Sequence, residues 1–130
     1  MKERKVLFVD DEKQILNMLE TAFSKKGYHV QTANSAEQAK GILEENKINV
    51  AFLDLNMPGE NGVDLCRWMK DENPISIVHA VTGYGRLYEL FDCRAAGFED
   101  YFLKPVNLTQ LYNATDVAFE KLERWFDKRK

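Results

Sequence analysis

The sequence predicts a doubly wound α/β domain with a five-stranded parallel sheet and five helices. Short apolar runs alternate five times with segments of helical periodicity, and only a few residues connect them. Parallel strands joined by right-handed helical crossovers are the expected packing for this order. The apolar runs are nearly continuous, as they are in strands that helices cover on both faces.

The predicted elements follow one another without a long linker. The strands are rich in β-branched and aromatic residues and span residues 5–9, 29–33, 50–55, 75–81 and 100–103. A helix follows each strand; the first ends at Gly27, and the others span about 36–45, 62–70, 86–96 and 107–127. We therefore expect a single domain over residues 1–130, whose last helix extends past the core.

The composition of the chain argues against several classes of function. A net charge of −3 and an isoelectric point near 5.4 give no broad basic surface for nucleic acid or for an anionic membrane. The sequence contains neither a long apolar run typical of a membrane span nor a signal peptide. Cys66 and Cys93 lack the spacing of a metal or disulfide motif. We expect a cytoplasmic protein with two buried, reduced thiols.

Polar side chains stand at the ends of four predicted strands. Asp10 and Asp11 follow the first strand, and Asp54 ends the third. Thr82 ends the fourth strand, and Lys104 follows the fifth. In the flavodoxin-like strand order 2-1-3-4-5, the first and third strands flank the crevice at the carboxyl ends where such sheets bind ligands. We expect these five side chains to converge there.

The chemistry of these side chains is that of a phosphoryl-binding site. Carboxylates in one crevice repel one another and need a hard divalent cation, and oxygen ligands suit Mg²⁺. The ammonium of Lys104 and the hydroxyl of Thr82 could hold the oxygens of a phosphoryl group on Asp54. Asp54 would then act as a nucleophile and form an acyl phosphate.

The motifs around these residues resemble the receiver domains of two-component response regulators, particularly the stand-alone chemotaxis type. The resemblance runs from about residue 5 to about residue 119, and it rests on Asp10-Asp11, Asp54 with Met57-Pro58-Gly59 and Gly62, Thr82-Gly83, and Lys104-Pro105. It implies that Asp54 accepts a phosphoryl group from a phosphohistidine on a sensor histidine kinase or a histidine phosphotransfer protein. Such a protein is a signalling receiver that catalyses its own phosphorylation and dephosphorylation, and it is not a conventional enzyme.

The resemblance also implies a role for each residue of the metal and phosphoryl site. Asp10, Asp11, Asp54 and the backbone carbonyl of Asn56 would arrange Mg²⁺. Thr82 and Lys104 would bind the phosphoryl oxygens.

Four positions concern switching and phosphoryl lifetime in this family. Thr82 would move toward the phosphoryl group and Tyr101 would turn inward with it, which changes the surface of the fourth helix, fifth strand and fifth helix. Asn56 and Tyr84 would tune dephosphorylation, because they control how attacking water is held or excluded. We expect the bulky Tyr84 to shield the acyl phosphate.

The end of the last helix carries an apolar cluster of Leu122, Trp125 and Phe126. Two interpretations remain open: packing back on the domain, or a surface for a homodimer or another partner. Because no output domain is apparent after this helix, we expect signalling through a downstream protein that the sequence does not name.

Other functions are compatible with parts of the pattern. A magnesium-dependent phosphohydrolase of the haloacid-dehalogenase plan would need a general acid two residues after Asp54, where this chain has Asn56. A flavodoxin-like FMN carrier would need a phosphate-binding loop after the first strand, where three acids stand. A receiver-like interaction module without phosphorylation also remains open.

Overall fold

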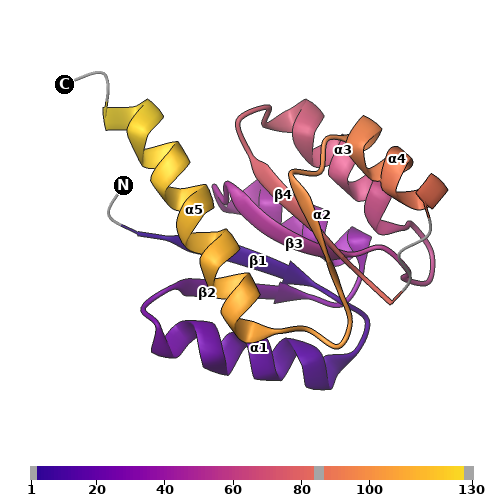
Figure 1. The fold of residues 1–130 in the computed structure, drawn as a ribbon, viewed down its shortest axis with the longest axis horizontal. Coiled ribbons are helices and arrows are strands. Elements are labelled where there is room, and N and C mark those ends of the chain that lie inside the picture. The colour runs from indigo at the N-terminus through magenta and orange to yellow at the C-terminus, as the bar shows by residue number, and fades with distance from the viewer. Residues whose placement is uncertain (1–2, 84–86, 128–130) are drawn as a thin grey trace.

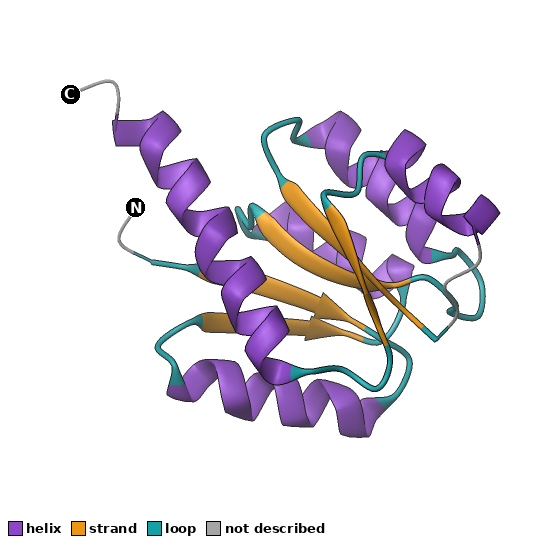
Figure 2. Cartoon of the chain, viewed as in Figure 1, coloured by secondary structure: helices purple, strands orange, loops and turns teal. Residues whose placement is uncertain are grey.

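The chain folds as a five-stranded parallel sheet with helices on both faces, as the sequence predicts. The structure is a computed structural model that describes residues 3–83 and 87–127. The strands are β1 (Lys5–Val9), β2 (His29–Ala33), β3 (Val50–Asp54), β4 (Ile77–Thr82) and β5 (Asp100–Leu103). The helices are α1 (Lys13–Lys25), α2 (Ala36–Glu45), α3 (Gly62–Glu72), α4 (Leu87–Ala96) and α5 (Leu108–Asp127). The strand order is β2-β1-β3-β4-β5 (Figures 1 and 2).

Two hydrophobic layers hold the helices on the sheet. Successive strand residues point to opposite faces, so neighbours such as Leu53 and Phe52 belong to different layers. One layer packs the sheet against α1 and α5, and the other packs it against α2, α3 and α4 (Figure 1). β3 and β4 are buried along their whole length, which explains why their sequences read as continuous apolar runs.

The register of the sheet brings the carboxyl ends of its strands to one edge. Asp54 is paired with Val81, and Thr82 is paired with Leu103. The backbone N–H of Lys104 donates to the carbonyl oxygen of Thr82 over 2.8 Å, which continues the ladder one step past β5. Residues that follow β1, β3, β4 and β5 in the sequence therefore lie close together in space.

The fourth strand begins two residues later than the sequence predicts. The segment before it turns at Asn73, whose carbonyl oxygen accepts hydrogen bonds from the backbone N–H and the hydroxyl of Ser76. Strand pairing then begins at Ile77, and Ile75 is left half-exposed at the surface. A prediction from apolar content alone starts this strand too early, because the turn before it depends on hydrogen bonds that the apolar pattern does not reveal.

The last helix is the longest, and its end projects beyond the sheet (Figure 1). Asn107 caps it, because its side-chain oxygen accepts a hydrogen bond from the backbone N–H of Gln110. Leu122 is buried and Phe126 packs against the α1–α5 layer, whereas the side chain of Trp125 is 69% exposed. Among the described residues, no helix combines the length and apolar character needed to span a membrane.

Candidate functional site

Asp54 is a buried carboxylate at the end of β3. Asp54 is only 3% exposed to solvent. Oδ1 accepts a hydrogen bond from the backbone N–H of Asn56 at 3.1 Å, and Oδ2 lies 3.5 Å from Nζ of Lys104. Burial raises the pKa of Asp54 to about 6; the charges of Asp10 and Asp11 add to this, against the Asn56 hydrogen bond and Lys104. The Asn56 hydrogen bond and the charge of Lys104 thus only partly offset the effect of burial on this carboxylate.

Gly62 fixes the backbone on the other side of Asp54. A Cβ at position 62 would lie 2.3 Å from the carbonyl oxygen of Asp54 and 3.1 Å from Cα of Leu55. Both are backbone atoms, so they cannot turn away as a flexible side chain could. Only glycine allows the start of α3 to approach the end of β3 this closely.

Lys104 connects three carboxylates at the mouth of the site. Its Nζ lies 3.0 Å from Asp10, 3.4 Å from Glu12 and 3.5 Å from Asp54. Burial disfavours the ammonium, but the hydrogen bond with Asp10 and the three negative charges outweigh it and raise the pKa of Lys104. Lys104 is the first residue after β5, and the peptide bond between Lys104 and Pro105 is cis.

Thr82 completes this edge of the sheet. It is the last residue of β4 and is fully buried. Its backbone carbonyl binds the N–H of Lys104, so these two residues are direct neighbours across the β4–β5 edge. The structure therefore places Thr82, Lys104, Asp54 and Asp10 at one edge, as the sequence predicts.

The acidic residues after β1 fit a hard divalent cation. Asp10, Asp11 and Glu12 can each offer one oxygen, and these ligand atoms lie within 4.8 Å of one another. Asp10 is buried, whereas Asp11 and Glu12 are exposed. Repulsion from Asp10 and Asp11 helps to raise the pKa of Asp54, and a cation would relieve it. Carboxylate oxygens of this kind are the ligands that Mg²⁺ prefers.

Comparison with known proteins identifies the family. Residues 6–116 match the response regulator receiver domain. The chain belongs to this family. The alginate biosynthesis transcriptional regulatory protein AlgB from Pseudomonas putida is 37% identical over 116 residues, which are 89% of this chain and 26% of AlgB. This receiver domain thus spans about a quarter of the length of the curated relatives that it matches.

Solved receiver domains have the same fold. A response regulator receiver domain from Clostridium thermocellum has a TM-score of 0.86 and 31% identity, with 93% of this chain and 98% of that chain covered. The beryllofluoride-activated NtrC4 receiver domain, solved in solution as a dimer, has a TM-score of 0.85 and 30% identity, with 91% and 98% covered.

The remaining predicted site residues differ in how the structure places them. Asn56 is exposed beside Asp54 and touches it through its backbone N–H. Tyr101 lies on β5 opposite Ala80, and it is 42% exposed at the surface. Tyr84 lies outside the described residues. The roles assigned to these three residues stay predictions.

Glu12 belongs to the site although the sequence reasoning gave it no role there. The acids after β1 can be explained by the favourable position of negative charge at a helix N-terminus, and this explanation hides the contact with Lys104. The available signal was the third consecutive acid after Asp10 and Asp11. The structure shows that Oε1 of this third acid lies 3.4 Å from Nζ of Lys104.

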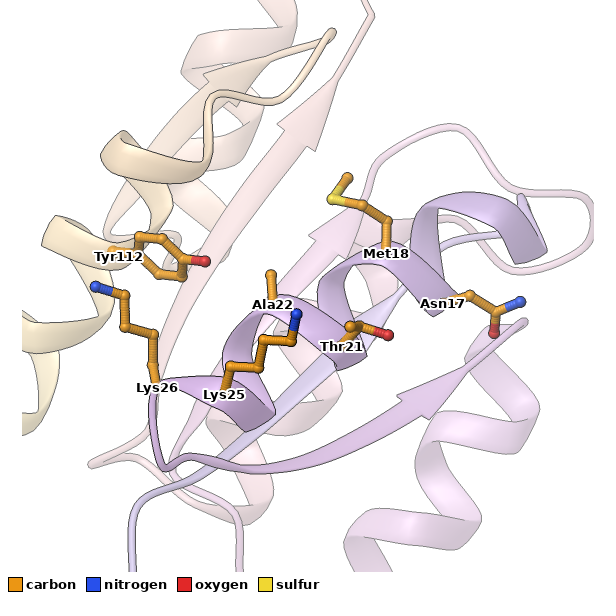
Figure 3. Close-up of a pocket in the computed structure, with 7 residues that line it drawn as sticks. All are labelled: Asn17, Met18, Thr21, Ala22, Lys25, Lys26 and Tyr112. Carbon is orange, nitrogen blue, oxygen red and sulfur yellow. The ribbon is translucent and has the colours of Figure 1, made fainter.

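A separate pocket of about 730 Å³ lies between α1 and α5 (Figure 3). Its lining residues are Asn17, Met18, Thr21, Ala22, Lys25, Lys26 and Tyr112. Nζ of Lys26 lies 4.7 Å from the centroid of the Tyr112 ring, as expected for a cation–π contact. None of the residues around Asp54 lines this pocket, so it is distinct from the site at the strand ends.

The raised pKa of Asp54 predicts that Asp54→Asn stabilises the metal-free protein. The folded value of about 6 lies above the ordinary value of 3.8, so the stability that a protonated Asp54 contributes is present below pH 3.8 and is lost as pH rises through 6. Asparagine stays neutral but loses the attraction between the carboxylate and Lys104, so we expect a gain of about 2 kcal/mol at pH 7.5.

Urea unfolding with a chelator present, from pH 4 to pH 8, measures this difference. Asp92→Asn, at an exposed position on α4, is the matched control and should show no comparable gain. An Asp54→Asn curve that runs parallel to the parent curve across this range contradicts the prediction.

Proposed function

We propose that this receiver domain accepts a phosphoryl group on Asp54 from a phosphohistidine of a sensor histidine kinase or a histidine phosphotransfer protein. The observation that carries the proposal is the surroundings of Asp54. A buried carboxylate with a raised pKa lies between an ammonium and an acidic cluster. Such a combination of burial and charge partners is typical of reactive groups.

The residues divide the reaction among them. A carboxylate oxygen of Asp54 attacks phosphorus, the P–N bond to the donor histidine breaks, and the imidazole keeps the electron pair and takes up a proton. Lys104 binds the phosphoryl oxygens and neutralises their charge, and the hydroxyl of Thr82 donates to them. Mg²⁺ held by Asp10, Asp11, Asp54 and the carbonyl of Asn56 would supply Lewis-acid stabilisation of the phosphoryl charge.

The same site governs the return to the resting state. We propose that the receiver catalyses its own dephosphorylation by water, with Asn56 and Tyr84 controlling the access of that water. The donor and the target are proteins, and we place their signalling in the cytoplasm. Neither nucleic acid nor membrane is part of this proposal for the chain by itself.

Output is proposed to use the surface of α4, β5 and α5. Apolar side chains are exposed on these elements, namely Phe91, Tyr101, Leu103 and Val117. A surface of this kind suits a protein partner. We propose that Thr82 moves toward the phosphoryl group and that Tyr101 turns inward. A second copy of this chain is a candidate partner besides a separate downstream protein, because the related NtrC4 receiver domain is a dimer when beryllofluoride activates it.

Incubation with Mg²⁺ and acetyl phosphate tests the proposed phosphoryl acceptor. Intact mass should show the gain of one phosphoryl group in the parent and no gain in Asp54→Asn. Asp71→Asn, at an exposed position on α3, is the matched control and should gain the group like the parent. Omission of Mg²⁺ should suppress the gain. A parent protein without any gain would favour an interaction module that phosphorylation does not regulate.

A further inference from the structure

The side chain of Glu12 contacts Lys104 instead of capping its own helix. Glu12 is the N-cap residue of α1, and its backbone carbonyl accepts hydrogen bonds from the N–H groups of Ile15 and Leu16. Its side chain makes no capping hydrogen bond. Oε1 lies 3.4 Å from Nζ of Lys104, 92 positions away in the sequence. Glutamate is also not among the preferred N-cap residues, so the cap does not explain this side chain.

The ammonium of Lys104 lies nearest to Asp10 and at nearly the same distance from Glu12 and Asp54. Its Nζ is 3.0 Å from Asp10 and 3.4 Å from Glu12, against 3.5 Å from Asp54. An ammonium has three hydrogens to donate, and three carboxylates already surround this one. For Lys104 to bind the oxygens of a phosphoryl group on Asp54, it must therefore give up its contact with one of these carboxylates.

We propose that Glu12 is a positioning residue that holds Lys104 in this resting place and thereby opposes phosphorylation of Asp54. The inference rests on the proposed function. Two effects of Glu12 have the same sign: its carboxylate attracts the ammonium away from the incoming oxygens, and its negative charge repels the phosphoryl dianion. Removal of this charge should favour the phosphorylated state.

The same charge has the opposite effect on the divalent cation. The ligand atoms of Glu12, Asp10 and Asp11 lie within 4.8 Å of one another, so Glu12 adds negative charge where a cation would bind. Removal of this charge should weaken the binding of Mg²⁺. A residue that served only the stability of α1 would not change the two affinities in opposite directions, and this contrast provides the test.

The experiment compares Glu12→Gln with the parent in two titrations. Isothermal titration calorimetry measures the Kd for Mg²⁺ alone, and then the Kd for beryllofluoride at saturating Mg²⁺. The side chain of Glu12 is 61% exposed. We therefore expect modest changes, with the Kd for Mg²⁺ rising about threefold and that for beryllofluoride falling about threefold. Both changes should shrink at high salt, because screening weakens exposed charges.

Two further variants separate the charge from the contact. Glu12→Asp keeps the charge on a shorter side chain, so it should restore the affinity for Mg²⁺ but only part of the opposition to beryllofluoride. Glu37→Gln removes an exposed acid from the first turn of α2 and should change neither affinity. In the metal-free protein, the ammonium resonance of Lys104 should shift in Glu12→Gln and stay in place in Glu37→Gln.

The outcomes distinguish this inference from the proposed function. A parent that binds no beryllofluoride with Mg²⁺ present refutes the proposed function, and the inference falls with it. A parent that binds it with the same affinity as Glu12→Gln overturns the inference alone. Affinities for Mg²⁺ and beryllofluoride that change in the same direction, or an unshifted Lys104 resonance, also overturn it.

Discussion

Gly62→Ala is expected to destabilise the folded protein by about 3 kcal/mol, because overpacking against a fixed backbone is costly. The added Cβ would lie 2.3 Å from the carbonyl oxygen of Asp54 and 3.0 Å from its carbonyl carbon. These atoms belong to the end of a buried strand in the middle of the sheet. Relief of the clash requires the start of α3 or the end of β3 to move, so uptake of the phosphoryl group should also slow.

Gly41→Ala is the matched control for this substitution. Gly41 lies inside α2 and is exposed, and a Cβ there would meet nothing within 4 Å. Alanine has the higher helix propensity, so this variant should gain about 0.5–1 kcal/mol. Urea unfolding followed by circular dichroism measures both variants, and acetyl phosphate labelling follows the site. Equal stability of Gly62→Ala and the parent would contradict the proposed close approach.

The fold and the location of the site were predictable because both follow from local patterns. Continuous apolar runs such as the one over 50–54 indicate strands buried on both faces, and the structure confirms them. Once the strands are parallel, their carboxyl ends must share one edge. The meeting of Asp54, Thr82 and Lys104 at one edge is therefore a consequence of topology, not of any contact visible in the sequence.

What the sequence could not provide are the contacts made by long side chains. Lys104 could pair with Asp54 alone or with several acids, and only the three-dimensional arrangement shows that Asp10 and Glu12 share it. The same applies to Gly62, whose match to a motif says nothing of the backbone atom it approaches. Side-chain direction and close backbone approach depend on tertiary packing, which periodicity does not encode.

His79 is a buried polar residue, and the sequence does not reveal the free energy that its burial costs. The residue is 3% exposed in β4, and its ring centroid lies 4.8 Å from that of Phe52 and 5.7 Å from that of Phe102. Neither ring nitrogen has a hydrogen-bond partner among the described residues. Burial lowers the pKa of His79 to about 4, so the side chain is neutral in the folded protein near pH 7.

His79→Leu is expected to remove a loss of stability that the parent suffers in acid. The folded pKa of about 4 lies below the ordinary value of 6.5, so between these values the unfolded chain binds a proton that the folded chain does not. The parent is therefore fully stabilised above pH 6.5 and loses stability as pH falls toward 4. At about 1.4 kcal/mol per pH unit, the full loss is about 3 kcal/mol.

The free energy of unfolding of parent and variant, measured in urea from pH 4 to pH 7.5, tests this expectation. The difference between them cancels the contributions of other groups, including Asp54, whose raised pKa acts in the opposite direction. His79→Leu should also gain about 1–3 kcal/mol at pH 7.5, because it removes two desolvated and unpaired nitrogens.

His29→Leu is the control. It makes the same chemical change, but at a position on β2 that is exposed. It should keep the acid dependence of the parent. If His79→Leu loses stability toward pH 4 as steeply as the parent does, the burial of neutral His79 is not the cause. If both variants lose the dependence, the acid sensitivity does not depend on the burial of the histidine, and the explanation by the burial of His79 fails. Only the predicted contrast assigns the acid sensitivity to the packing of His79 between Phe52 and Phe102.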